Sequence, residues 1–237
     1  MKNKKDLVSV VMSCYNSEKT IDEAIESIIN QSYNNLELLI MDDGSNDGSV
    51  EKLNYYKNKY ENIRIFRNKN NLGLTKSLNL LIKKSYGEFI ARQDSDDISF
   101  KNRIDKQVKE MKKYDLDFCT TRALVKNTRK KIPGISYFFP SKIISKFKNP
   151  FIHGTLMIKK NSIKEIGLYN ESFYYSQDYK LIADMFDRKY KYRKINKPLY
   201  VLNMENNISN NKKNEQDYFA KCVKEKSLPD LNIEFNK

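Results

Sequence analysis

Several features that define common protein classes are missing from this chain of 237 residues. No apolar run reaches about 18 residues, so we expect no membrane-spanning helix. A basic start precedes the first apolar stretch, LVSVVM at 7–12, but this stretch is short and no small-residue cleavage site accompanies it. We therefore expect it to form the first strand of a fold and not a signal peptide.

Cysteines are few, and glycine-rich phosphate-binding loops are absent. The three cysteines, Cys14, Cys119 and Cys222, are odd in number, far apart and without a CxxC pair. They predict neither a disulfide framework nor a zinc site, and they favour a reducing, cytosolic compartment. The sequence also contains neither GxGxxG nor GxxxxGKS/T, which argues against a dinucleotide-binding fold and a P-loop.

Acidic residues are absent from one long stretch, 118–164, where basic and aromatic residues interleave. The whole chain has 44 Lys and Arg against 30 Asp and Glu, a net charge of +14. Such an excess favours anionic partners, namely nucleic acid, anionic lipid headgroups or phosphorylated substrates, although a Lys-rich and Asn-rich composition also serves solubility. The basic residues form no recognisable nucleic-acid-binding motif, which leaves a membrane surface as the better candidate partner.

What the sequence does contain is a regular alternation of strand-like and helix-like segments. Short apolar runs predict strands at 7–12, 36–41, 63–66 and 88–93, with helices from Ile21 onward, at 47–60 and at 74–84. This order predicts an α/β fold with a mostly parallel, doubly wound central sheet flanked by helices. The second half is less regular, with a helix expected at 100–114, strands at 117–122 and 155–159, a helix at 177–189, a strand at 190–203 and a polar, helical tail at 206–237.

Polar residues follow three of the expected strands where each strand ends. These are Ser13 to Asn16, the pair Asp42 and Asp43, and the acidic cluster Asp94 to Asp97. Ligands of doubly wound sheets bind beyond the carboxyl ends of the strands. The three segments therefore predict one site at this edge.

The acidic segments have alternative interpretations. Asp94, Asp96 and Asp97 would bind Mg²⁺ or Mn²⁺, which prefer oxygen ligands and often share substrate phosphates, or Asp97 would cap a helix. The DDGS sequence at 42–45 would accept hydrogen bonds from a nucleotide or would only form a turn. With no phosphate loop present, a metal and basic side chains such as the nearby Arg92 would have to balance phosphate charge.

Two further residues have chemistry to offer. His153 is the only histidine and lies just before an expected strand, where a structural role and a role in a site are both open. No GxSxG accompanies it, so a serine triad is not predicted. Asp178, in YYSQDYKL, would begin a helix, either as a favourable charge at its amino end or as a general base in a partly apolar pocket.

Taken in order, these motifs resemble the family 2 glycosyltransferases of the GT-A fold. The resemblance rests on the segments VSVVMSCYN, MDDGS, NKNNLG, GEFIARQDSDD, HGTLMIKK and YYSQDYKL, and it covers about residues 6–203. It implies one catalytic domain at 1–205, with a nucleotide-sugar-binding half at 1–97 and an acceptor-binding half at 98–205. It also implies an inverting hexosyl- or N-acetylhexosaminyltransferase of bacterial surface polysaccharide synthesis, which moves a sugar from a UDP-sugar to a glycan or lipid-linked acceptor.

The resemblance assigns residues to the donor site. Ser13 and Tyr15 would line the nucleotide pocket, with Tyr15 stacking on the base, and Asp43 would hydrogen-bond uracil. Asp94 and Asp96 would approach the ribose and the diphosphate.

The remaining roles concern the metal and the proton. Asp97, helped by Asp96, would hold Mn²⁺ or Mg²⁺, and Asp178 would deprotonate the acceptor hydroxyl. The enzyme would be cytoplasmic, with peripheral attachment to the inner face of the membrane as an option.

The sequence departs from the family at three points. Gln177 replaces an acidic residue found before the base in many relatives, Asn203 lies where many carry a basic or histidine-containing motif, and the processive QxxRW pattern is absent. A polymerising synthase is therefore not expected. A nucleic-acid-binding protein and a non-catalytic sugar-nucleotide-binding subunit stay open as alternatives.

Overall fold

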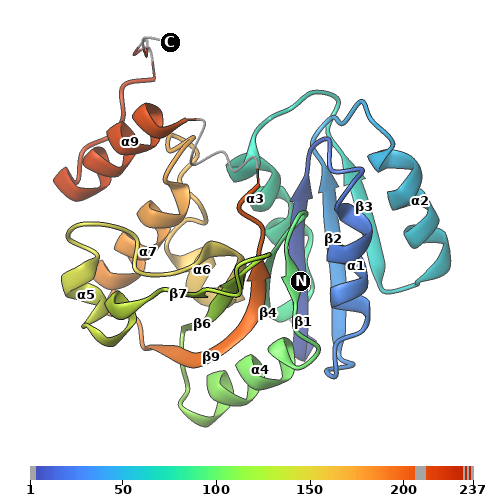
Figure 1. Cartoon of the computed structure of the whole chain (residues 1–237), viewed down its shortest axis with the longest axis horizontal. Coiled ribbons are helices and arrows are strands. Elements are labelled where there is room, and N and C mark those ends of the chain that lie inside the picture. The colour runs from blue at the N-terminus through green and yellow to red at the C-terminus, as the bar shows by residue number, and fades with distance from the viewer. Residues whose placement is uncertain (1–3, 206–211, 232, 234, 236–237) are drawn as a thin grey trace.

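One mixed sheet runs through the centre of the protein, with helices on both faces (Figure 1). The computed structural model describes residues 4–205, 212–231, 233 and 235. Within them the strands lie in the order β3-β2-β1-β4-β8-β6-β9-β5, and β7 pairs with β6 outside this path. This confirms the α/β fold class.

The first half of the chain is the parallel, doubly wound unit that the sequence predicts. All three strand pairs in it are parallel. Its strands are β1 (Lys4–Cys14), β2 (Leu36–Asp42), β3 (Ile63–Arg67) and β4 (Gly87–Asp94), joined by α1 (Ile21–Ile29), α2 (Ser49–Lys59) and α3 (Leu74–Lys84).

Apolar side chains of β1 supply both faces of the sheet. Val8 and Val10 pack into a cluster with residues of α1, α2 and α4 (Arg103–Lys113). Val11 packs on the other face with residues of α3, α6 (Lys160–Glu165) and α7 (Gln177–Asp187). A strand whose two faces both pack into an apolar core has a nearly continuous run of apolar residues. The LVSVVM stretch has that character, which is why the sequence located this strand correctly.

The second half extends the sheet with mixed pairing. The pairs of β4 with β8, β6 with β8, β6 with β7 and β5 with β9 are antiparallel, while β6 and β9 are parallel. Its strands are β5 (Ile98–Ser99), β6 (Phe118–Val125), β7 (Lys131–Ile132), β8 (Met157–Lys159) and β9 (Tyr192–Leu202). Its helices are α4 (Arg103–Lys113), η1 (Ile135–Phe138), α5 (Ser141–Ile144), η2 (His153–Thr155), α6 (Lys160–Glu165) and α7 (Gln177–Asp187).

A last helix, α9 (Lys213–Glu225), packs against the segment that precedes α7 and against α7 itself. Phe219 of α9 meets Phe173 and Tyr175, with ring centroids 6.2 and 5.8 Å apart. Part of the expected helical tail, 206–211, lies outside the described residues. No helix in the described parts of the chain is long and apolar enough to cross a bilayer.

Candidate active site

The carboxyl ends of β1, β2 and β4 lie side by side. Ser13 is in register with Asp94 on one side of β1, and Cys14 is in register with Asp42 on the other. The Asp43 amide donates to the Cys14 carbonyl at 2.9 Å. The three polar segments singled out in the sequence therefore meet at one edge of the sheet, where Tyr15 is 48% exposed.

Asp43 holds the loop that leads into α3. Its Oδ1 accepts hydrogen bonds from Asn68 Nδ2 at 2.7 Å and from the Leu72 amide at 2.9 Å. Its Oδ2 accepts one from the Gly73 amide at 2.9 Å. The carboxylate is buried, and these donors compensate the loss of water. Because Asp43 Oδ2 accepts only this one hydrogen bond among the described residues, it can accept a second. The neighbouring Asp42 forms an ion pair with Arg67, with 3.0 Å between Asp42 Oδ2 and Arg67 Nε.

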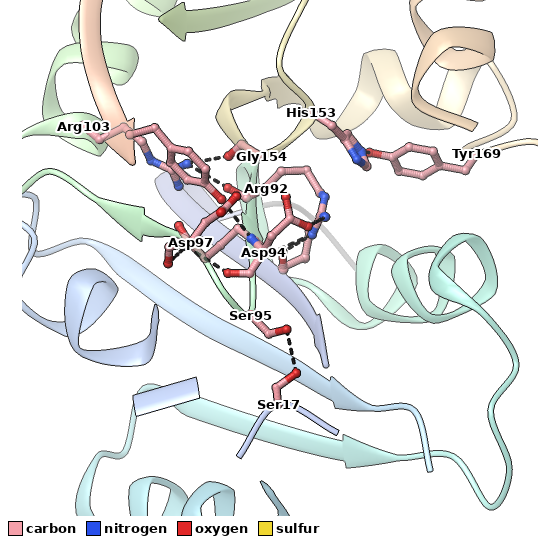
Figure 2. A network of polar contacts seen from close by, with 12 residues as sticks. Ser17, Arg92, Asp94, Ser95, Asp97, Arg103, His153, Gly154 and Tyr169 are labelled. Carbon is pink, nitrogen blue, oxygen red and sulfur yellow. Dashed lines mark hydrogen bonds and ion pairs between the residues drawn. The ribbon is translucent and has the colours of Figure 1, made fainter. Parts of the chain in front are cut away.

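The acidic cluster forms a turn between β4 and β5, which we call the acidic turn (residues 94–97) (Figure 2). Arg92, inside β4, forms an ion pair with Asp94 and also donates to the carbonyls of Val11 and Gln93. Its side chain is 1% exposed. Arg92 thus supports the site through Asp94, and a direct contact of Arg92 with a donor phosphate stays a prediction.

Asp97 does not cap a helix. Strand β5 follows it directly at Ile98, and α4 begins only at Arg103. Asp97 Oδ1 instead accepts a hydrogen bond of 2.7 Å from the amide of Asn203, just beyond β9. This contact ties the acidic turn to the far end of the chain's last strand.

Among the described residues, neither Asp96 nor Asp97 forms an ion pair, and the more distant charges of Arg92 and Lys126 only partly offset the repulsion at Asp96. Burial raises the pKa of Asp96 to about 6 and that of Asp97 to about 8, and the negative charges of Asp94, and for Asp97 also of Asp96, add to the shift. A divalent cation would offset this repulsion, and carboxylate oxygens are ligands that Mg²⁺ and Mn²⁺ accept. The pair therefore fits a metal, although no three Asp, Glu, His or Cys side chains of the described residues are arranged to hold one by themselves.

A buried arginine that the sequence analysis missed lies under the turn. Arg103 donates to the carbonyls of Arg92 at 2.9 Å and Gly154 at 2.7 Å, and its guanidinium lies 5.3 Å from the ring centre of Tyr200. Burial lowers its pKa to about 10. Gln107, four residues further along α4, is also buried and donates to the Thr155 carbonyl at 2.8 Å. Two polar residues at helical spacing were therefore the one sequence pattern that could have indicated the buried Arg103.

His153 and Asp178 line one small pocket, together with Asn149 and Phe151. Asn149 Nδ2 donates to Asp178 Oδ2 at 2.6 Å. His153 Nε2 shares a hydrogen bond of 2.7 Å with the Tyr169 hydroxyl (Figure 2). Burial and the positive charge of Arg92 lower the pKa of His153 to about 4, so the imidazole is neutral at pH 7.

This pocket lies close to the acidic turn. A Cβ on Gly154, the residue after His153, would lie 2.8 Å from Asp94 Oδ2. Asp94 and Asp178 both act electrostatically on His153. A larger hollow of about 680 Å³, lined by Lys83, Glu171 and Asp184 among others, includes neither the acidic turn nor Asp178.

Three solved and curated proteins resemble this chain over most of its length. An O-antigen biosynthesis glycosyltransferase of Escherichia coli, WbnJ, is 35% identical over 181 residues, 74% of this chain and 70% of the relative. A putative glycosyltransferase of Bacillus subtilis, EpsE, is 37% identical over 169 residues, 68% of this chain and 59% of the relative. The chain thus spans about 60% of the length of some of the curated relatives that it matches. The structure of S. aureus TarS 1-349 in complex with UDP-GlcNAc has a TM-score of 0.72 at 22% identity, covering 87% of this chain and 60% of that TarS fragment.

A second structural likeness is to a mannosyltransferase. The mannosyltransferase PcManGT from Pyrobaculum calidifontis, in complex with GDP-Man and Mn²⁺, has a TM-score of 0.74 at 15% identity and covers 94% of this chain and 65% of its own. Both structural likenesses concern the fold. The sequence pattern that defines the family described as "Glycosyl transferase family 2" matches residues 9–182, well over half of the chain. This chain belongs to glycosyl transferase family 2.

Proposed function

We propose that this chain transfers a sugar from a UDP-sugar to a hydroxyl group of a glycan or lipid-linked acceptor, with inversion at the anomeric carbon. The observation that carries the proposal is that Asp94 lies beside Gly154, whose neighbour His153 lines one pocket with Asp178. The names of similar proteins support it. TarS binds UDP and UDP-GlcNAc, PcManGT binds GDP-Man, and WbnJ acts in O-antigen biosynthesis. We place the reaction in bacterial surface polysaccharide synthesis, at the inner face of the cytoplasmic membrane.

The donor binds at the carboxyl ends of β1, β2 and β4. Ser13 and the exposed Tyr15 line the nucleotide pocket, and the remaining acceptor position of Asp43 Oδ2 receives the uracil N–H. Asp94, fixed by Arg92, and Asp96 receive hydrogen bonds from ribose and border the diphosphate.

Asp97 and Asp96 would hold Mn²⁺ or Mg²⁺. Because two carboxylates supply only part of the shell of such an ion, binding of the ion would depend on the donor. When bound, the ion supplies positive charge to the departing diphosphate.

Asp178 accepts the proton of the acceptor hydroxyl. As this oxygen forms its bond to the anomeric carbon, the bond between that carbon and the diphosphate oxygen breaks, and its electron pair leaves with the diphosphate. Asn149 fixes one carboxylate oxygen of Asp178 at 2.6 Å, which leaves the other for the acceptor. Attack opposite the leaving group inverts the configuration.

Release of nucleotide from a panel of nucleotide sugars, with and without Mn²⁺ and with candidate glycan acceptors, tests the proposal. We expect Asp178→Asn to lower kcat by about 10²–10⁴-fold, the usual contribution of a general base. The matched control is Asp187→Asn, which changes an exposed aspartate at the other end of the same helix, where it pairs with Lys226. This variant is expected to keep wild-type turnover.

Two results would overturn parts of the proposal. If no donor is turned over with any acceptor while UDP still binds, the chain is the non-catalytic subunit instead. If Asp178→Asn retains full turnover, the base lies elsewhere. Proton NMR of the product reports the anomeric configuration, and retention would exclude the direct displacement.

A further inference from the structure

An unusual apolar surface lies on the second half of the molecule. Five large apolar side chains within 13 residues face solvent, and we call them the apolar rim: Ile135 (80% exposed), Phe138 (70%), Phe139 (53%), Ile143 (52%) and Phe147 (71%). They belong to η1, α5 and the connections around them, at the left edge of Figure 1. Isolated exposed apolar residues are ordinary, but five within 13 residues of sequence indicate a surface that binds something.

The segment is fixed to the domain by its polar atoms. The Tyr137 hydroxyl donates to the Lys194 carbonyl at 2.8 Å, and Lys194 Nζ donates to the Phe139 carbonyl at 2.9 Å. The Tyr179 hydroxyl of α7 donates to the Ser145 carbonyl. Two tyrosine hydroxyls and one lysine amine thus bind this segment to neighbouring elements, while its five large apolar side chains face solvent. The apolar rim is therefore held in place and is not a loosely attached loop.

The charges around the rim indicate its partner. Lys142, Lys146 and Lys148 alternate with the rim residues and are exposed, and none of them has an ion-pair partner among the described residues. No acidic residue occurs anywhere in 118–164. Apolar side chains bordered by unpaired lysines match the interface of an anionic bilayer, where acyl chains lie below phosphate headgroups.

A second copy of the chain fits this surface less well. If two rims faced each other across a twofold axis, the three lysines of one copy would approach those of the other without an intervening carboxylate. Like charges brought together in this way oppose association. An anionic lipid surface meets the same lysines with opposite charge.

We propose that the apolar rim inserts into an anionic lipid bilayer, with Lys142, Lys146 and Lys148 contacting the headgroups. Asn149, two residues beyond Phe147, holds Asp178. A rim seated in the bilayer therefore places the acceptor pocket next to the membrane surface, where the hydroxyl of a lipid-linked glycan is presented. The purpose of this membrane contact rests on the proposed function. Binding to lipid itself requires neither the donor nor the acceptor.

Flotation of the full chain with vesicles tests the contact. We expect binding to vesicles of 30% phosphatidylglycerol in phosphatidylcholine and little binding to pure phosphatidylcholine. Each lysine near the headgroups is worth roughly a fivefold change in partitioning, so Lys142→Gln/Lys146→Gln/Lys148→Gln is expected to weaken binding by at least about tenfold. Phe138→Ser/Phe147→Ser is expected to weaken it comparably. The matched control, Lys19→Gln/Lys57→Gln/Lys101→Gln, removes three exposed lysines elsewhere and is expected to retain most of the binding.

The absence of tryptophan from the chain allows a direct test of insertion. Phe138→Trp introduces a single indole whose emission is expected to shift to shorter wavelength with the anionic vesicles and to be quenched by brominated acyl chains. Tyr55→Trp, on α2 and 56% exposed in the wild type, is expected to show neither effect.

Three outcomes would overturn the proposal. These are no binding to anionic vesicles, equal binding to neutral ones, or a concentration-dependent dimer that Phe138→Ser/Phe147→Ser abolishes. The substituted side chains are exposed, so the variants are expected to keep the wild-type thermal midpoint, and loss of binding then reports the surface. Nucleotide release in solution is measured on the same variants. A variant that no longer binds vesicles but still releases nucleotide has lost the membrane contact and not the transferase activity.

Discussion

Neighbouring carboxylates in the acidic turn differ in what offsets their charge. Asp94 has the guanidinium of Arg92, whereas Asp97 has an amide hydrogen bond and no cation. Burial and its acidic neighbours raise the pKa of Asp97 to about 8. Carboxylates three positions apart thus have different surroundings: Asp94 is paired with a fixed internal charge, and Asp97 is not.

His153 offers a prediction at the level of a single side chain. Its pKa of about 4 lies below the ordinary 6.5 because burial and Arg92 disfavour the charged ring. Above pH 6.5 the ring is neutral in both the folded and the unfolded chain. As pH falls from 6.5 to 4, only the unfolded chain binds the proton, so the free energy of unfolding decreases, by no more than about 3 kcal/mol.

Because His153 is the only histidine, one ring resonance in the NMR spectrum reports the titration without assignment. We expect it to stay constant from pH 8 to about 5 in the folded protein and to titrate near 6.5 in urea. His153→Gln is expected to remove this part of the acid destabilisation. A folded-state midpoint above pH 6 would show that the ring is open to solvent or paired with Asp178.

The sequence located the acidic residues of the site but not the arginine beneath them. Charge clusters are visible in one dimension, and their position after strands follows from the alternation of elements. The burial of Arg103 depends on two carbonyls that come from residues 92 and 154. No local pattern can show that these acceptors converge on one guanidinium.

Among the elements, the loop at 68–73 shows how one connection is fixed from two sides. Asp43 accepts hydrogen bonds from the amides of Leu72 and Gly73. A Cβ on Gly73 would lie 2.8 Å from the Tyr174 ring, and the φ of Gly73 is +88°. The loop thus lies between the donor edge of the sheet and the segment that leads to Asp178.

We expect Gly73→Ala to lower the free energy of unfolding by about 2–4 kcal/mol. The positive φ contributes roughly 1 kcal/mol or slightly more, and the clash with Tyr174 contributes the rest. Gly167→Ala is the matched control, because its φ is +85° but a Cβ there would meet nothing within 4 Å. The free energies of unfolding of both variants in urea separate the cost of the positive φ, which both share, from the clash with Tyr174, which only Gly73→Ala introduces. Equal losses would mean that Tyr174 moves aside freely.

Most elements of five or more residues were predicted well, whereas the two-residue strands β5 and β7 were missed. The expected helix at 74–84 has the bounds of α3, and the strand expected at 36–41 matches β2 to within one residue. Strand β5 was missed because two residues carry no periodicity. Its conformation depends on pairing with Tyr200 and Val201 of β9, about 100 residues away. This omission is also why Asp97 looked like a helix cap.

At the scale of the whole molecule, the candidate site joins both halves of the chain. Ser13 and Asp94 belong to the parallel strands, while Asn203, which donates to Asp97, follows β9. The division at residue 97 into a donor half and an acceptor half stays a prediction about ligands. Structurally, one sheet runs across it through the pairing of β4 with β8.

This arrangement predicts that metal and nucleotide stabilise the whole fold together. Asp96 and Asp97 provide too few ligands for a tight site, and no other Asp, Glu, His or Cys of the described residues completes it. We therefore expect Mn²⁺ alone to shift the thermal midpoint little, and Mn²⁺ with UDP to shift it by more than the sum of the separate shifts. Ligand at about 100 times its Kd adds about 2.7 kcal/mol, which corresponds to roughly 5–10 °C for a chain of this size.

Asp97→Asn tests whether the synergy arises at the acidic turn. Its side-chain oxygen can still accept the Asn203 amide, but the charge that attracts the ion is gone, so the shift with Mn²⁺ and UDP is expected to fall to that of UDP alone. EDTA is expected to produce the same loss in the wild type, and Asp187→Asn is expected to keep the full synergy. Above pH 8, where the unliganded Asp97 is charged, Asp97→Asn removes a poorly compensated buried charge, and without ligands it is expected to melt no lower than the wild type. A lower midpoint of the variant would mean that Asp97 mainly stabilises the fold. If UDP shifts the wild-type midpoint equally with and without Mn²⁺, the proposed metal does not bind with the donor.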